Sequence, residues 1–245
     1  MGVIDDYKRT VKEVRERKFK PLYLLHGEED YFIDRVEEEI RKHVLEEQER
    51  DFNQTILYGR DTDAEQVKDA CARYPMMAER QLIVVREAQT WRPEQWDKLE
   101  AYAKKPTPTT VLVLCHKHKK IDGRKGFAKT AAKHGAIFLS DKLKDDKLPG
   151  WIQTYVKHFG RQIGPAEAQL LADHLGSELG KVTGEVEKLC LVSPAGGKIT
   201  GDLIQRYVGI SKDHNVFELQ NAIGAGDHGK VMRIASVFAH DPKEH

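Results

Sequence analysis

The chain has 245 residues, of which 32% are charged, and its formal net charge is only +1 at pH 7. This balance excludes a global field that would attract nucleic acid or a membrane surface, so any such contact needs a local patch. The first residues form neither a signal peptide nor a membrane segment, and no apolar run reaches about 18 residues, so the sequence predicts a cytoplasmic protein without a membrane partner.

The beginning of the chain predicts a helix, a strand and a second helix. Apolar residues at positions 4, 7, 11 and 14 recur at helical spacing, and the apolar run 22–25 leads to Gly27. A strand, a tight turn and a helix N-terminus in this order are typical of nucleotide-binding α/β domains, because the unpaired amides of the helix can hold phosphate.

The residues after this turn do not supply nucleotide chemistry. A P-loop that starts at Gly27 needs a second glycine, a lysine and a hydroxyl at fixed spacing, where this chain has Phe32, Ile33 and Asp34. The acidic residues 28–30 would repel phosphates, and they also suit the first turn of a helix, where they offset its dipole. The sequence therefore predicts a degenerate nucleotide site with neither cofactor nor metal.

Strands and helices alternate up to about residue 140. The expected strands are residues 22–25, 52–58, 82–85, 111–114 and 136–139. The third and fourth runs are apolar throughout, which is typical of parallel strands that are buried on both faces. Residues 1–140 are therefore predicted to form an α/β domain with a doubly wound, parallel sheet of five strands.

One connecting helix leads into an unusual turn. Thr62 and Glu65 predict a capping box, and the apolar stripe that follows reaches Tyr74 before a proline ends it. Turns of this kind normally carry polar residues, but this one contains Met76 and Met77. Two interpretations are open: the methionines are exposed anchors for a partner, or at least one of them fills the core beneath its own helix.

The chain lacks the usual marks of a metal site or an ATPase. Cys71, Cys115 and Cys190 are far apart, and each lies in an apolar pattern, so we expect reduced core cysteines. An ATPase of this fold also needs an acidic pair after the third strand, where this chain has Arg86 and Glu87. Hydrolysis is therefore not expected.

The composition changes at residue 141. The segment 141–147 is almost entirely charged, no further strand pattern follows, and the apolar spacing up to residue 207 predicts four helices. We therefore expect a small helical domain over residues 141–211. The last segment, 212–245, has patterns for two helices only, which cannot bury a core by themselves and so predict the beginning of an incomplete domain.

The order and spacing of these features resemble the delta subunit of the bacterial DNA polymerase III clamp loader, an AAA+-like family. The matching stretches are residues 21–34, 74–86, 178–191 and 215–223. The resemblance implies an AAA+-like α/β domain, a helical lid and the start of a collar domain within which the chain is truncated. It implies a noncatalytic subunit that binds and opens the sliding clamp (beta subunit) for loading on primed DNA during replication, with gamma/tau and delta-prime subunits as further partners.

The resemblance also implies where these partners bind. In the family an apolar tip enters a pocket on the clamp, and the matching residues here are Tyr74, Pro75, Met76 and Met77, with methionines where leucine and phenylalanine are common. This set is the expected clamp-binding site.

The most basic segment, residues 116–125, follows the fourth strand. In an assembled loader Lys119, Lys120, Arg124 and Lys125 could contact DNA phosphates, although a charged run is more often a solvated loop.

Two rival functions remain open. A divergent P-loop-like NTPase or phosphotransferase that uses Gly27 would bind nucleotide. A DNA-binding regulator built on the same fold would bind duplex DNA alone and ignore the clamp.

Overall fold

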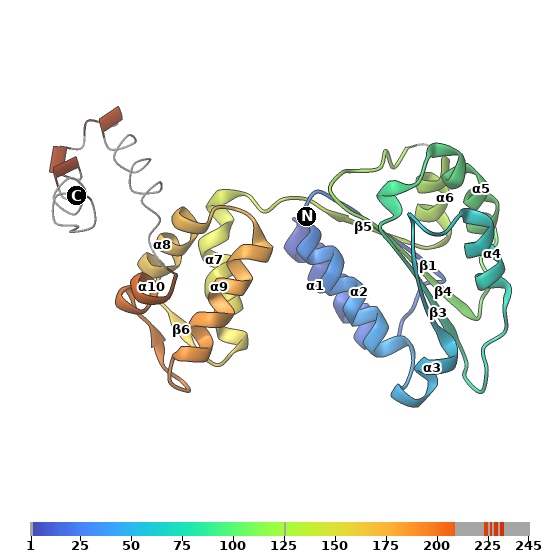
Figure 1. Cartoon of the computed structure of the whole chain (residues 1–245), viewed down its shortest axis with the longest axis horizontal. Coiled ribbons are helices and arrows are strands. Elements are labelled where there is room, and N and C mark those ends of the chain that lie inside the picture. The colour runs from blue at the N-terminus through green and yellow to red at the C-terminus, as the bar shows by residue number, and fades with distance from the viewer. Residues whose placement is uncertain are drawn as a thin grey trace. The chain divides into compact units, whose positions relative to one another are not determined.

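In the computed structural model, the described residues are 2–124, 126–208, 223–224, 226, 228–229 and 231–232. The chain divides into two compact units, residues 1–143 and 144–245 (Figure 1). The expected boundary at 211–212, and most of the expected third domain, lie outside the described residues.

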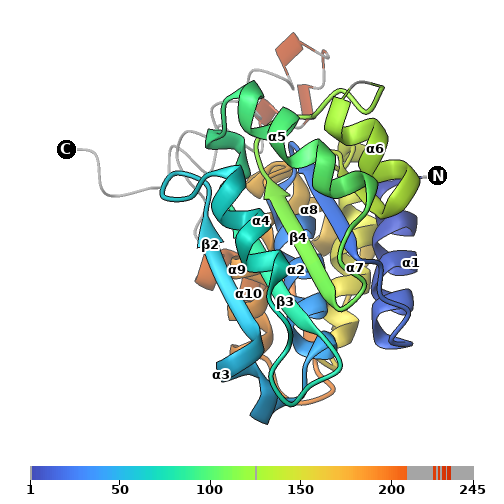
Figure 2. The same cartoon turned by 90° about the vertical axis from the view of Figure 1, so that its right-hand side faces the viewer.

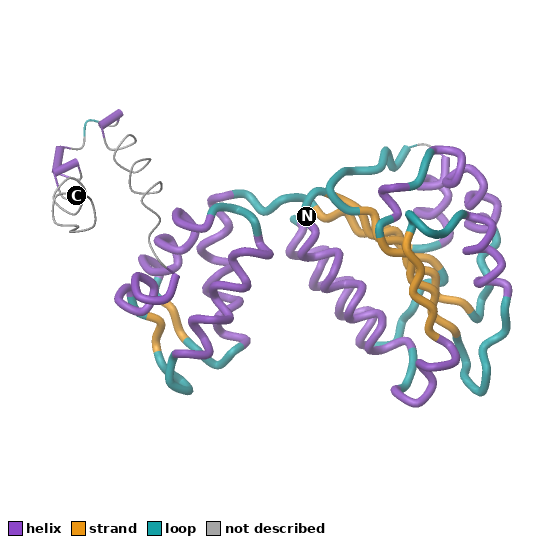
Figure 3. Tube along the Cα trace, viewed as in Figure 1, coloured by secondary structure: helices purple, strands orange, loops and turns teal. Residues whose placement is uncertain are grey.

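One parallel sheet of five strands organises the first unit (Figure 3). Its strands are β1 (Leu22–Gly27), β2 (Gln54–Tyr58), β3 (Gln81–Arg86), β4 (Thr110–His116) and β5 (Ala136–Ser140). They lie in the order β2-β3-β4-β1-β5. All of β4 and nearly all of β3 are buried, which explains their continuous apolar sequences. The predicted α/β fold with five parallel strands is confirmed.

Helices cover both faces of the sheet (Figure 1 and Figure 2). On one face lie α4 (Ala64–Ala72), α5 (Pro93–Lys104) and α6 (Gly126–His134). On the other lie α1 (Val3–Arg15) and α2 (Asp30–Val44). Single turns are α3 (Arg50–Asn53), η1 (Glu47–Glu49) and η2 (Ala88–Thr90). Alternate strand side chains point to each face, so Val85 and Leu114 pack with Leu99 and Phe127 in the main core.

The second strand starts later than its predicted first residue, 52. Residues 52 and 53 belong to α3, because the side-chain amide of Asn53 donates to the carbonyl of Glu49 (3.0 Å) and closes a helical turn. Phe52 therefore lies outside the sheet, with 71% of its surface exposed.

Both ends of α4 also differ from the prediction. The cap is Asp63 rather than Thr62: its Oδ1 accepts from the amide of Gln66, and the Gln66 side chain accepts from the amide of Asp63, both at 2.9 Å. The helix ends at Ala72. Tyr74 leaves the apolar stripe because a residue before proline avoids the helical conformation.

The second unit is mainly helical, as predicted. Up to residue 208, its helices are η3 (Asp145–Lys147), α7 (Leu148–His158), α8 (Pro165–Leu175), α9 (Leu179–Val192) and α10 (Gly201–Val208). Leu171, Val182, Val186 and Leu189 are fully buried within it. The expectation that no strand follows residue 141 was wrong, since β6 (Gln162–Ile163) and β7 (Lys198–Ile199) pair in parallel. Strands of two residues are too short to produce a periodic pattern.

Two further expectations concern the described part of the chain. Its three cysteines are free and buried, as predicted, and burial raises the pKa of the Cys71 thiol to about 12. No helix there combines the length and the apolar character that a membrane crossing requires.

Candidate functional site

The turn after β1 is closed by the end of β5. The Ser140 carbonyl accepts hydrogen bonds from the amides of Glu28 (2.9 Å) and Glu29 (3.1 Å), the donors that a phosphate-binding turn would direct at its ligand. Gly27 has a φ of +145°, and a Cβ at this position would overlap the Ser140 carbonyl oxygen. Glycine is therefore required for the approach that occupies these amides.

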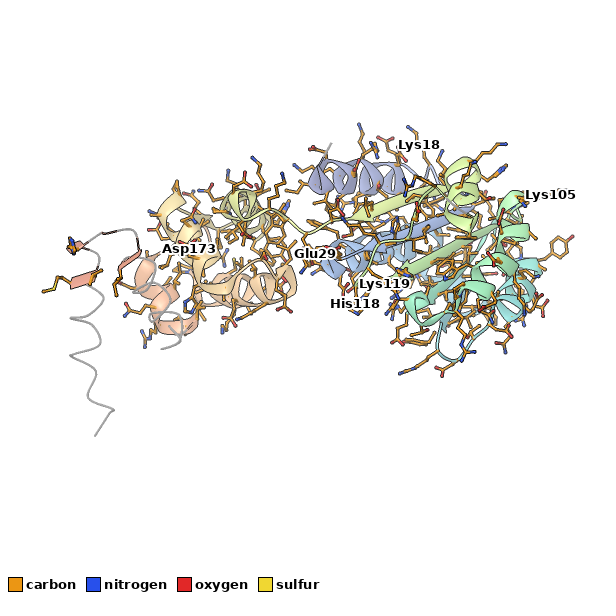
Figure 4. All side chains as sticks on the ribbon, turned by 90° about the horizontal axis from the view of Figure 1, so that it is seen from above. Lys18, Glu29, Lys105, His118, Lys119 and Asp173 are labelled. Atoms are coloured by element: carbon orange, nitrogen blue, oxygen red, sulfur yellow. The ribbon has the colours of Figure 1, made fainter. Side chains whose placement is uncertain are left out.

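Side chains and a loop fill the space beyond this turn. Glu29 caps α2 by accepting from the amide of Tyr31 (3.1 Å). The loop after β4 folds over the same helix end: Lys119 forms an antiparallel bridge with Gly27, and His118 Nδ1 lies 3.0 Å from a carboxylate oxygen of Asp30. Figure 4 shows Glu29, His118 and Lys119 at this edge of the first unit. Protein groups thus stand where phosphates would bind.

The other positions of the degenerate site serve packing and ion pairing. Phe32 and Ile33 are fully buried, and the centroid of the Phe32 ring lies 5.3 Å from that of the Tyr7 ring. Asp34 pairs with Lys117 Nζ at 2.6 Å. The residues that replace the P-loop glycine, lysine and hydroxyl are therefore part of the fold itself.

At the end of β3, where an ATPase would need an acidic pair, an ion pair stabilises the fold instead. Arg86, at the end of this strand, donates to both carboxylate oxygens of Glu37 (3.0 and 3.1 Å), and Glu37 is 4% exposed. Among the described residues, no group of three metal-ligating side chains is found.

A buried histidine at the same edge is held neutral. His26 Nδ1 accepts from the amide of Ile121 (3.0 Å), which requires that this nitrogen carry no proton. Burial and the neighbouring His116 lower the pKa of His26 to about 4. The pKa of His116 is also lowered, again mainly by burial. Both rings are therefore neutral near pH 7.

The structure does not bring the expected DNA-contacting residues together as a cluster of unpaired cations. Lys120 pairs with Asp141 (2.8 Å) and Arg124 with Asp122 (3.0 Å). Lys125 lies outside the described residues. Lys119 is exposed, and within the described part of the chain its ammonium group has no acidic partner.

The opposite edge of the sheet carries the apolar tip, which we define as Tyr74, Pro75, Met76 and Met77. Exposed fractions are 87% for Tyr74, 60% for Met76 and 100% for Met77, and Pro75 is half-buried. The interpretation of the methionines as core filler is therefore wrong. Three large apolar side chains face solvent on one short segment, as anchors of an interface do.

Polar side chains fix the backbone just before the tip and within it. Gln81, 5% exposed, directs its amide nitrogen at the carbonyl of Arg73 (2.6 Å), just after α4. Asn53 Oδ1 accepts from the amide of Met76 (2.6 Å), and its Nδ2 donates to the Met76 carbonyl (2.9 Å). Sequence reasoning missed both residues, because a single amide side chain next to a strand carries no signal of a distant backbone partner.

The strand order, the helix after β1 and the helical second unit define the class: an AAA+-like α/β protein with a closed phosphate-binding turn. A family profile described as DNA polymerase III, delta subunit, matches residues 23–140. Among curated proteins, Bacillus subtilis DNA polymerase III subunit delta is 27% identical over 220 residues, which cover 86% of this chain and 63% of the relative. The chain is therefore similar to DNA polymerase III delta subunits, and the profile match is confined to residues 23–140.

Solved structures agree on the fold. The Bacillus subtilis DNA clamp loader delta protein has a TM-score of 0.68 at 24% identity, over 97% of this chain and 73% of that protein. The Thermotoga maritima RuvB Holliday junction branch migration motor has a TM-score of 0.51 at 12% identity, over 98% of this chain and 81% of that protein. At these identities the structures show the AAA+-like fold alone. The chain spans 63% of the length of the curated relative that it matches.

Proposed function

We propose that this protein is a noncatalytic clamp-loader subunit that binds the sliding clamp through the apolar tip and stabilises its open form for loading on primed DNA. The observation that carries the proposal is the complete exposure of Met77 beside Met76 on a segment that buried amide side chains hold in place. Similarity to DNA polymerase III delta subunits and to a clamp loader delta protein supports the sliding clamp as the partner, which would then be handed on to ATP-driven gamma/tau and delta-prime subunits.

Physical chemistry supports the tip as a binding element. Unbranched, polarizable methionine side chains fill irregular apolar pockets well. Buried apolar anchors at the centre of an interface contribute most of the binding free energy, while surrounding contacts mainly exclude water. A backbone fixed before binding also reduces the entropy that association costs. Opening would then require only that the open clamp bind this surface more tightly than the closed clamp does.

The test removes the anchors without disturbing the fold. We expect Met76→Ala combined with Met77→Ala to weaken clamp binding by about 3 kcal/mol, roughly a hundredfold, in a calorimetric titration against the clamp from the same source. The melting temperature should not change, because both side chains are exposed. Leu191→Ala, at a residue of the second unit with 84% exposure, is the matched control and should bind normally. Unchanged affinity of the double variant would refute the proposal.

The rival NTPase makes an opposite prediction for nucleotide. It would need the amides of Glu28 and Glu29, which both bond to Ser140. A titration of the same preparation with a fluorescent ATP analogue and magnesium should therefore show no binding above background, and saturable binding would favour the rival.

A further inference from the structure

We propose that the clamp-binding surface extends beyond the apolar tip onto α3, where Phe52 is a further anchor, and that Asn53 is the residue that positions tip and anchor relative to each other. This inference rests on the proposed function. Its partner is the same sliding clamp, whose receiving surface would have to be apolar over a wider area than two methionine side chains cover.

Phe52 and the tip lie at the same edge of the sheet. β2 and β3 are parallel neighbours, with Gln54 paired to Leu82, so the residues that precede the two strands are adjacent. α3 immediately precedes β2, and the segment with the tip precedes β3. Figure 1 and Figure 2 both show α3 at the end of the sheet where the connection from α4 enters β3.

Asn53 joins the two segments directly. Asn53 is 3% exposed, and its side chain makes three hydrogen bonds: Oδ1 accepts from the amide of Met76 (2.6 Å), and Nδ2 donates to the carbonyls of Met76 (2.9 Å) and Glu49 (3.0 Å). Asparagine thus uses both of its donors and its acceptor at once. The bonds to Met76 fix the tip, and the bond to Glu49 fixes the helical turn that presents Phe52.

These contacts give a reason for the exposed ring. A single exposed aromatic side chain is ordinary on a protein surface. Phe52, however, is next in sequence to the residue that holds Met76, and it shows 71% of its surface to solvent. A turn of four residues is not stable alone, so the buried amide of Asn53 holds the backbone at Phe52 on the segment that is bonded to Met76. A backbone that is ordered before binding reduces the entropy lost when its side chain contacts an apolar surface.

The experiment measures affinity of the whole chain for the sliding clamp by calorimetry, with the Met76→Ala and Met77→Ala double variant as reference. We expect Phe52→Ala to weaken binding about tenfold with an unchanged melting temperature. Phe159→Ala, at a partly exposed aromatic residue of the second unit, is the control and should bind like wild type. Normal binding by Phe52→Ala, while the double methionine variant fails, would overturn this inference and leave the proposed function intact.

Positioning by Asn53 has its own signature. Asn53→Ala should weaken binding about tenfold in the wild-type background but cause little further loss once Phe52, Met76 and Met77 are all alanine, because its effect passes through those three side chains. Asn53→Asp keeps the acceptor for the Met76 amide and should retain part of the affinity. Equal losses in both backgrounds would show a general effect on folding and would overturn the positioning role. If the double methionine variant itself binds normally, the proposed function fails first.

Discussion

The two edges of the central sheet use their polar groups in opposite ways. At the carboxyl ends of the strands, the amides of Glu28 and Glu29 bond to Ser140, and the loop after β4 pairs with acidic residues of α2. At the amino ends, Asn53 and Gln81 are buried and bind backbone groups, while the side chains of the tip face solvent.

This contrast bears on where the fold can bind a partner. Open parallel sheets normally meet ligands at the carboxyl ends of their strands. Here that edge is satisfied internally, and the positions that a phosphate would require, Phe32 and Ile33, belong to the core. Binding proposed at the other edge does not depend on the nucleotide chemistry, so each edge can be perturbed separately.

The largest expected effect comes from Gly27 at the carboxyl edge. Gly27→Ala would place a Cβ against the Ser140 carbonyl at a φ of +145°, so we expect a loss of about 3 kcal/mol or more in the free energy of unfolding by urea. Gly123→Ala, where added atoms meet open space, is the matched control. Clamp affinity of the folded fraction should not change. A loss below about 1 kcal/mol would mean that the turn relaxes easily and that the closed edge is not rigid.

A smaller effect concerns pH at the same edge. The pKa of His26 is lowered to about 4, so between its ordinary value of 6.5 and 4 the unfolded chain takes up a proton that the folded chain does not. Stability is therefore fully present above pH 6.5 and falls as pH falls, by about 2 kcal/mol for this partly screened group.

Urea unfolding between pH 7 and pH 4.5 checks this prediction. His26→Gln should flatten the acid-side slope of the unfolding free energy, and His158→Gln, at an exposed position, should leave it unchanged. Some slope should persist because the pKa of His116 is lowered as well. Equal slopes for wild type and His26→Gln would show that His26 takes up its proton at the same pH in the folded and the unfolded chain.

Features with a strong local signal could be predicted from the sequence. The buried strands β3 and β4 appear as continuous apolar runs, because both faces of a parallel sheet are covered. The lack of a P-loop motif could be recognised because a P-loop needs particular residue types at fixed spacing from Gly27. Adjacent methionines in a turn indicated the tip, although the residues alone could not distinguish exposure from core packing.

Features that depend on distant partners could not be predicted. Asn53 and Met76 are 23 residues apart, and the Ser140 hydroxyl reaches the carbonyl of Glu29 across 111 residues. Neither pair has a periodicity that reveals it. The ion pair between Lys120 and Asp141 also joins residues that no sequence pattern links. It occupies one of the lysines that were expected to contact DNA.

The smallest expected effect tests whether the closed edge retains any contact with DNA. Lys119 is the described member of the predicted set without an acidic partner, so Lys119→Glu should reduce the salt slope of primer-template binding by the assembled loader by about 1. Lys105→Glu is the control, because Lys105 lies between α5 and β4 at the amino edge (Figure 4). An unchanged slope for Lys119→Glu would remove DNA from the carboxyl edge, whereas equal reductions for both variants would indicate a general charge effect. Because each phosphate contact contributes a fixed increment to the slope, even one lysine is measurable where its effect on affinity at physiological salt is less than about tenfold.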